Sequence, residues 1–156
     1  MRPLHKLLHA VKCAQWKCEV VVDFYCADVW ADPSAGSVLY RLLQTMRATE
    51  ASVAACVYRK RGVGDVQVLV APEQPGEVYD ADWCAIGLAL FDMRRLKNLP
   101  LPWFEFEFSP DGCDIVMGED LYFCYKAKEA GHRIVADWTI PTYHADSVHL
   151  ANGVIE

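Results

Sequence analysis

The hydrophobic positions of the chain follow helical and strand-like patterns in turn. Apolar residues recur at three- and four-residue spacing over 2–16 and again over 38–46, which predicts two amphipathic helices. Runs of β-branched, aromatic and other apolar residues over 19–25, 52–58 and 85–91 are typical of buried strands. This alternation of helix and buried strand predicts an α/β fold with a mostly parallel sheet flanked by helices.

A further amphipathic helix is expected to begin after Gly118, at the adjacent carboxylates Glu119 and Asp120, and to end near Gly131. The apolar residues expected on its buried face are Leu121, Cys124 and Tyr125. Acidic residues stabilise the first turn of a helix whatever its function, so a purely structural interpretation of the acidic pair stays open.

Between these elements the pattern is more irregular. Residues 62–82 are rich in glycine and proline, which predicts a loop-rich segment with one short strand at 66–70. Residues 103–108 alternate aromatic and acidic side chains, which predicts a strand with one apolar and one polar face. A turn at 110–112 follows, and 133–136 is predicted to be a short strand.

Composition narrows the class of protein. With 156 residues, 53% of them hydrophobic, the chain can form one domain, 1–156, around a substantial core. Its formal charge of −6 argues against nucleic-acid binding as the main function. We find neither an apolar run long enough to span a membrane nor a secretory signal pattern, and so expect a cytoplasmic protein.

Seven cysteines are scattered through apolar segments without a Cys-x-x-Cys pair. This spacing argues against a zinc knuckle, and we interpret most of the cysteines as small buried side chains in a reducing compartment.

Three chemically useful groups lie far apart in the sequence. Asp28 follows the end of a predicted buried strand, Asp120 opens a helix, and His144 follows the strand after that helix. Ligands of open α/β sheets bind beyond the carboxyl ends of the strands. If the three groups converge there, two of them can hold a divalent cation and a carboxylate can take a proton from an attacking hydroxyl.

With these residues in view, the order of segments resembles the family-2 glycosyltransferases of the GT-A fold, over nearly the whole chain. The segments that carry the resemblance are Cys26-Ala27-Asp28, Val57-Tyr58-Arg59-Lys60-Arg61, the apolar strand containing Gly87, Leu99-Pro100-Leu101-Pro102-Trp103-Phe104, Gly118-Glu119-Asp120 with Leu121-Tyr122-Phe123-Cys124, Ala130-Gly131-His132-Arg133-Ile134, and His144.

The resemblance implies transfer of a sugar from a nucleotide-sugar donor to an acceptor hydroxyl, with inversion at the anomeric carbon. It implies that Asp120 is the general base and that Glu119 orients the acceptor or holds Asp120 in place. It also implies a Mn²⁺ or Mg²⁺ site, with Asp28 in the place of the family's Asp-x-Asp element and His144 completing it.

The candidate substrate-binding residues are Trp103, Trp83, Gly118 and Arg59. The two tryptophans are expected to stack on the sugar or the base, and Arg59 to meet a diphosphate or a phosphorylated acceptor. Packing roles for the tryptophans and a solvated loop for Arg59 stay open as alternatives.

Two departures from the family limit the prediction. Cys26 stands where the family has the first aspartate of Asp-x-Asp, and a thiol is a poor ligand for a hard cation. The nucleotide-binding half of the family's fold has no counterpart before Met1, so a truncated GT-A fold is expected. We therefore expect a homo-oligomer, or a partner chain that supplies the missing half.

Two other functions stay open. The first is a non-catalytic binding or assembly module, or one half of a split enzyme, which the missing donor half and Cys26 favour. The second is a Cys-dependent hydrolase using Cys26, which the absence of a glycine elbow argues against.

Overall fold

The structure is a computed structural model that describes residues 7–11, 21–25, 29–31, 37–58, 70–72, 76–140 and 142–144. Side chains are described from residue 37 onwards, up to Thr142. The described strands are β1 (Leu7–Val11), β2 (Val21–Tyr25), β3 (Val29–Ala31), β4 (Val53–Cys56), β5 (Val70–Ala71), β6 (Val78–Asp80), β7 (Trp83–Cys84), β8 (Leu88–Asp92), β9 (Glu107–Phe108), β10 (Ile115–Met117), β11 (Ile134–Asp137) and β12 (Thr142–His144). The described helices are α1 (Val38–Thr49), the 3₁₀ helix η2 (Leu96–Asn98) and α2 (Glu119–Glu129).

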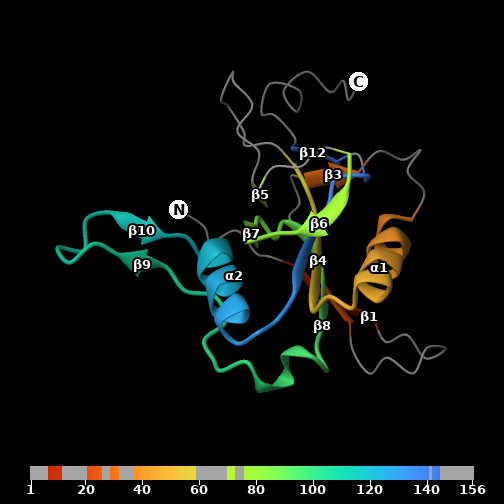
Figure 1. Ribbon diagram of the computed structural model, residues 1–156. Coiled ribbons are helices and arrows are strands. Elements are labelled where there is room, and N and C mark those ends of the chain that lie inside the picture. The colour runs from red at the N-terminus through yellow and green to blue at the C-terminus, as the bar shows by residue number, and fades with distance from the viewer. Residues whose placement is uncertain are drawn as a thin grey trace.

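A six-stranded sheet forms the centre of the molecule, with strand order β1-β2-β8-β4-β11-β6 (Figure 1). Among its described pairs, β4 and β11 run parallel, and every other neighbouring pair is antiparallel. The other described strands form two-stranded sheets, β10-β9, β12-β3 and β5-β7. The predicted mostly parallel sheet of the truncated GT-A type is therefore wrong: the chain has a mixed α/β fold with mixed and antiparallel sheets.

The physical reason for this error lies in how the central strands are covered. All the residues of β4, β8 and β11 are buried, so each strand is a continuous apolar run of the kind that parallel sheets usually show. In this protein the same burial arises because α1 and α2 cover opposite faces of a mixed sheet (Figure 1). When both faces of a strand are buried, its sequence does not show whether it runs parallel or antiparallel to its neighbours.

Alternate residues of the central strands divide the core into two parts. Val53, Phe91 and Ile134 face α2, and pack in one hydrophobic cluster with Phe123. The side chains between them along the strands face α1, and pack in a second cluster with Leu42. This period of two is the ordinary geometry of a strand buried on both sides.

The helix predicted over 2–16 is wrong where the structure describes the chain. Residues 7–11 form the edge strand β1, which pairs with β2 in antiparallel register, Leu7 opposite Tyr25 and Val11 opposite Val21. Pairing with β2 satisfies the backbone groups of this segment and overrides the helical spacing of its apolar residues.

Helix α1 confirms the helix predicted over 38–46. The observed helix begins at Val38, and the Ser37 hydroxyl accepts a hydrogen bond from the Tyr40 N–H at 3.4 Å as the N-cap.

Helix α2 begins where the sequence predicted but buries a partly different face. Phe123, Cys124 and Ala127 are buried, whereas Tyr125, expected on the buried face, is 56% exposed. The end of the helix agrees with the prediction, because Gly131 has a φ of +80° and its N–H bonds to the Lys128 carbonyl.

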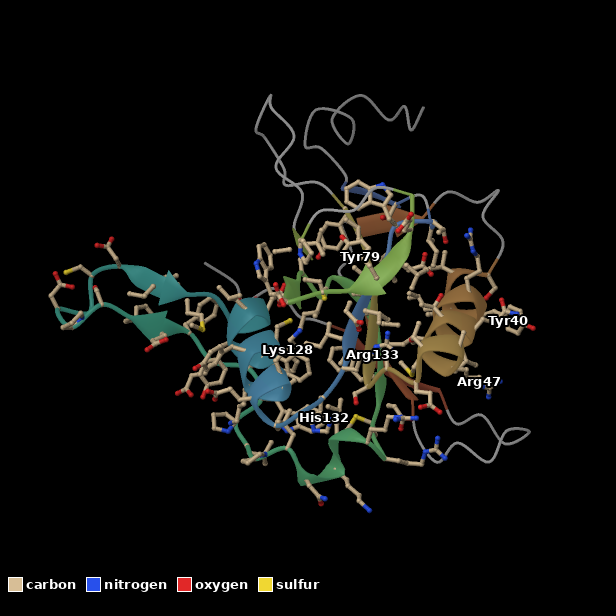
Figure 2. The ribbon with its side chains drawn as sticks, in the orientation of Figure 1. Tyr40, Arg47, Tyr79, Lys128, His132 and Arg133 are labelled. Atoms are coloured by element: carbon tan, nitrogen blue, oxygen red, sulfur yellow. The ribbon has the colours of Figure 1, made fainter. Side chains whose placement is uncertain are left out.

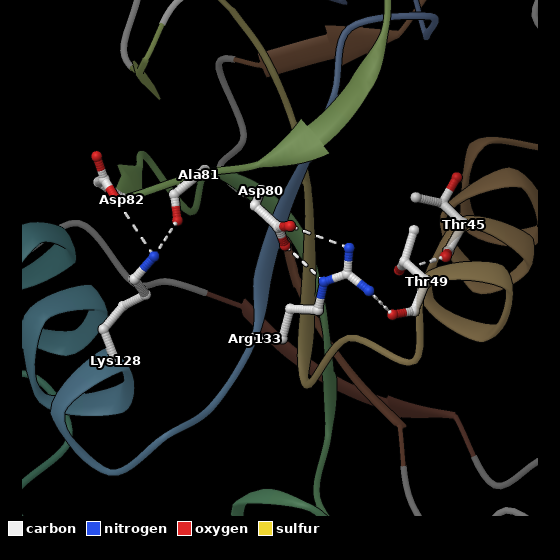
Figure 3. Close-up of polar contacts among 7 residues, drawn as sticks. All are labelled: Thr45, Thr49, Asp80, Ala81, Asp82, Lys128 and Arg133. Atoms are coloured by element: carbon white, nitrogen blue, oxygen red, sulfur yellow. Dashed lines mark hydrogen bonds and ion pairs between the residues drawn. The ribbon is translucent and has the colours of Figure 1, made fainter.

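Polar side chains tie both helices to the sheet edge at β6 (Figure 3). The Lys128 ammonium donates to the Ala81 carbonyl at 3.1 Å and to Asp82 at 3.2 Å. The Arg133 guanidinium pairs with Asp80 and donates to the Thr49 carbonyl at the end of α1. These contacts fix the C-terminal half of α2 and the start of β11.

The strand predicted over 103–108 is much shorter than expected. Only β9 is a strand within that range, and it forms a hairpin with β10 through the predicted turn, where Gly112 has a φ of +73°. Trp103 and Phe104 pack on Phe123 instead of joining a sheet.

Candidate functional site

The acidic pair predicted to carry the chemistry lies in the first turn of α2, directly after the extended residue Gly118. The positive end of the helix dipole stabilises the carboxylates of Glu119 and Asp120 there. A Cβ added at Gly118 would meet no atom within 4 Å, so packing does not require a glycine at this position.

Asp120 is fixed by a main-chain group from a distant part of the chain. One of its carboxylate oxygens, Oδ2, accepts a hydrogen bond from the Ile86 N–H at 3.1 Å. The Ile86 side chain is buried in the core, which holds that N–H in place. This contact joins the N-terminus of α2 to the segment that leads into β8.

The same segment is tied to the carboxyl end of β4. The Gly87 N–H donates to the hydroxyl of the buried Tyr58 at 2.8 Å. The Thr142 hydroxyl, at the start of β12, donates to the Val57 carbonyl at 2.5 Å. Because β4 and β11 are parallel, Tyr58 and Thr142 both lie beyond carboxyl ends, and Asp120 is anchored at this same end of the sheet.

The backbone of His144 belongs to β12, where it is the register partner of Val29 in β3. Asp28 and the side chain of His144 lie outside the described residues. The structure thus brings β12 and the start of α2 to one end of the sheet, and the approach of the two other predicted side chains to Asp120 stays a prediction.

Two of the buried cysteines, Cys124 of α2 and Cys84 of β7, meet where the helix packs on the core. The Cys124 thiol donates to the Cys84 carbonyl at 3.4 Å, and both side chains are within the core. Hydrogen bonding with Cys124, followed by burial, raises the pKa of the Cys84 thiol well above its usual value. A thiol held neutral in this way packs as a small apolar side chain, as the sequence suggested.

Of the four cysteines whose side chains are described, Cys56 is also buried and Cys113 is exposed on the β9–β10 turn. The prediction that most cysteines are buried therefore agrees with the described part of the chain.

The two tryptophans proposed to stack on a substrate have packing partners in the protein. Trp103 is half-buried, its indole N–H donates to the Leu99 carbonyl at 3.0 Å, and its ring lies 6.2 Å from that of Phe123. Trp83 in β7 is also half-buried against the same core. These contacts favour the packing interpretation for both side chains.

A metal site stays a prediction. Within the described residues, we find no group of three or more His, Cys, Asp or Glu side chains arranged to hold a metal ion. The two proposed ligands and Arg59 lie outside the described side chains.

Sequence analysis missed three groups that build this end of the molecule: the Ile86 N–H, the Tyr58 hydroxyl and the Thr142 hydroxyl. The N–H carries no signal that a sequence could show. Tyr58 stands at the end of a predicted strand, and its contact with Gly87 depends on β4 and β8 being antiparallel neighbours, whereas a mostly parallel sheet was expected.

No helix within the described part of the chain is both long and apolar enough to cross a membrane.

No family model and no curated protein matches the chain. Among solved structures, the chain is similar to A197 from STIV, with a TM-score of 0.56 and 17% sequence identity. The similarity covers 80% of this chain and 56% of A197, so the chain spans little more than half the length of that protein. At this level of identity, what the two proteins share is the fold alone.

Proposed function

We propose that the protein transfers a sugar from a nucleotide-sugar donor to an acceptor hydroxyl with inversion, and that Asp120 is the general base. The observation that carries the proposal is the position of Asp120. Its carboxylate stands in the first turn of α2, half-buried and aligned by the Ile86 N–H, beyond the carboxyl ends of the parallel pair β4 and β11.

The chemistry at that carboxylate is a single displacement. The acceptor oxygen forms a bond to the anomeric carbon as the bond from that carbon to the nucleoside diphosphate breaks, and the acceptor proton passes to Asp120. Inversion follows because the attacking and leaving oxygens are on opposite faces of the sugar. The adjacent Glu119 is suited to accept a hydrogen bond from another acceptor hydroxyl and so orient it.

The remaining partners belong to the same proposal. Asp28 and His144 would hold Mn²⁺ or Mg²⁺, which would neutralise the leaving diphosphate, and Arg59 would assist there. Trp83, which precedes Ile86 in the chain, would border the site, whereas Trp103 is hydrogen-bonded to the Leu99 carbonyl beyond the other end of β8 and would act through packing alone. We also propose a cytoplasmic location, with a second copy or a partner chain supplying donor-binding groups.

One observation favours a second candidate, a non-catalytic binding or assembly module. The hydrogen bond from Ile86 to Asp120 gives that carboxylate a structural role without any turnover. The stability of α2 then depends on hydrogen-bond acceptance at position 120 and on the negative charge at the helix N-terminus, and not on basicity.

Two substitutions separate the candidates. In Asp120→Asn the amide oxygen can still accept from the Ile86 N–H, whereas Asp120→Ala leaves that N–H without its acceptor, at a cost of about 1–3 kcal/mol. Under the catalytic proposal, both variants lose about 10²–10⁴-fold in nucleoside diphosphate release. The alanine variant melts earlier than the asparagine variant, which loses only the charge at the helix N-terminus, worth about 0.3–1 kcal/mol.

The assay uses the full chain with Mn²⁺ and a panel of UDP-glucose, UDP-N-acetylglucosamine, UDP-galactose and GDP-mannose. Thermal shift selects the donor, because a ligand bound only by the folded state raises the melting temperature. Glu129→Gln removes a carboxylate from the far end of the same helix and is the matched control. A donor bound and turned over equally by the native protein and by Asp120→Asn contradicts the proposed base.

A further inference from the structure

The β9–β10 hairpin exposes a continuous apolar surface. Phe106, Phe108, Ile115 and Val116 are 46%, 54%, 58% and 63% exposed. Exposure of this extent, on the order of a few hundred Å² over four neighbouring side chains, is characteristic of an interaction surface. Figure 1 shows the hairpin projecting from the body of the molecule beside α2.

Three of the four exposed apolar side chains lie on one face of the hairpin. Phe108 is the register partner of Ile115, and cross-strand partners share a face. Phe106 is two residues from Phe108, and their rings are 6.5 Å apart. We call Phe106, Phe108 and Ile115 the hairpin apolar face; Val116 is exposed beside it, at the register shift between Ile115 and Met117.

The opposite face of the hairpin carries an exposed carboxylate. Glu107 lies between Phe106 and Phe108 along the chain, so its side chain is on the face opposite to theirs, and both Glu107 and Glu105 are exposed. Their effect on α2 is electrostatic: partial burial and then a hydrogen bond with Glu105 raise the pKa of the Tyr122 hydroxyl, and the charge of Glu107 acts in the same direction.

Charge decides what can cover the hairpin apolar face. Residues 105–117 contain the acids Glu105, Glu107, Asp111 and Asp114 and no lysine or arginine. Two such hairpins repel each other, and so do the hairpin and an anionic lipid surface. A cationic partner with apolar side chains is complementary to this hairpin.

The shape of the hairpin specifies the partner further. In the described part of the chain, β9 and β10 form a sheet of their own, so a further strand can add at an edge. Side chains of an added strand alternate between the two faces. Apolar side chains would then meet Phe106 and Phe108, and basic side chains at the positions between would meet the acidic face.

From this geometry we infer that the β9–β10 hairpin is a docking site for an extended polypeptide segment with alternating apolar and basic side chains, which adds as a strand. The inference rests on the hairpin alone and is independent of the proposed sugar transfer.

The test uses a fluorescent peptide that alternates valine and lysine, titrated with the full-length protein and followed by anisotropy. We expect saturable binding that weakens with added salt. The double variant Phe106→Ser/Phe108→Ser lowers the affinity about tenfold or more, because both aromatic anchors are lost. Glu105→Gln/Glu107→Gln lowers the affinity and flattens its salt dependence.

The matched control is Tyr40→Ser, which removes an aromatic side chain that is 52% exposed on α1. Figure 2 shows Tyr40 on the side of the molecule away from α2, so this variant is expected to bind the peptide as the native protein does. A peptide of the same composition with its valines and lysines in separate blocks is expected to bind more weakly, since alternation is lost.

Several results overturn the inference. These are no binding of the alternating peptide, equal binding of the blocked peptide, and equal binding by Phe106→Ser/Phe108→Ser. Two further results would assign the hairpin apolar face to another partner. If the native protein binds zwitterionic lipid vesicles and Phe106→Ser/Phe108→Ser does not, the face contacts a membrane. If the native protein is a dimer in sedimentation equilibrium and this variant is not, the face contacts a second copy.

Discussion

Phe123 is the side chain through which α2 is packed onto the sheet, and its removal gives the most direct test of this arrangement. It is fully buried, and its ring lies 5.1 Å from Phe91 in an edge-to-face contact and 5.1 Å from Phe104 in a stacked one. It follows Asp120 by three residues, so the same packing that stabilises the fold also positions the candidate base.

The size of the effect can be worked out from these contacts. Replacing a buried phenylalanine by alanine costs about 3–5 kcal/mol, through lost burial and the cavity left behind. A domain of this size typically has a free energy of unfolding of about 5–15 kcal/mol, so Phe123→Ala is expected to remain folded but to lose a large part of that free energy. With a urea m-value of about 2 kcal/mol/M, the unfolding midpoint falls by about 2 M.

The measurement is urea unfolding followed by far-UV circular dichroism, with Tyr125→Ala as the matched control on the same helix. Tyr125 was expected in the buried face, but its side chain is exposed, so its replacement changes the free energy of unfolding by about 0.5 kcal/mol or less. Equal midpoint shifts for the two variants, or a loss below about 1 kcal/mol for Phe123→Ala, would refute this account of how α2 is held.

Two further predictions concern polar residues at the end of α1 and beside β11. Glu50 adopts a left-handed conformation with φ of +56°, so Glu50→Gly is expected to gain about 1 kcal/mol, raising the melting temperature by about 2–4 °C, whereas Glu50→Ala, which keeps the strain, gives no gain. The hydrogen bond from Arg133 lowers the pKa of Asp80, so this pair stabilises the fold above the ordinary aspartate pKa of about 3.9, and the contribution is lost as the pH falls through the lowered value. Asp80→Asn should therefore lower the urea midpoint at neutral pH, and only slightly, because both side chains of the pair are largely exposed. The difference in midpoint from the native protein should vanish in acid. A difference that persists in acid would contradict the role given to this pair.

The elements predicted correctly from the sequence are those whose signals are local. Helix α2 begins at adjacent acidic residues and ends at a glycine that takes a positive φ, and each of these features acts within one turn of the chain. The burial of β4 and β8 was equally visible, because every residue in them except Asp92 at the end of β8 is apolar.

What the sequence could not provide depends on partners far along the chain. Residues 7–11 become a strand because β2 lies beside them, and β8 is antiparallel to both of its neighbours, which its composition does not record. The alternation of aromatic and acidic residues over 103–108 predicted a strand with one buried face, but both residues of β9 are exposed. The aromatic side chains of this range that pack on α2 are Trp103 and Phe104, which lie outside the strand and contact Phe123.

The candidate site shows the same division. The acidic pair was found from its own neighbourhood, while the N–H that aligns Asp120 comes from a position 34 residues earlier, in a segment that the sequence identified only as an apolar strand. Tyr58 and Gly87 make a similar link across 29 residues. Such contacts depend on which strands are neighbours and on the direction in which they run, and the prediction of a mostly parallel sheet was wrong about direction.

The hydrogen bond from Ile86 does not by itself decide between a catalytic and a structural Asp120. A carboxylate has about four lone-pair positions, so acceptance of one N–H at Oδ2 is compatible with taking a proton from a substrate. An asparagine keeps the acceptor but has no basicity, and an alanine keeps neither. A protein in which Asn melts only slightly below the native form and turns over no donor uses Asp120 as a base, whereas one in which stability alone responds at this position uses the carboxylate to fasten α2 to β8.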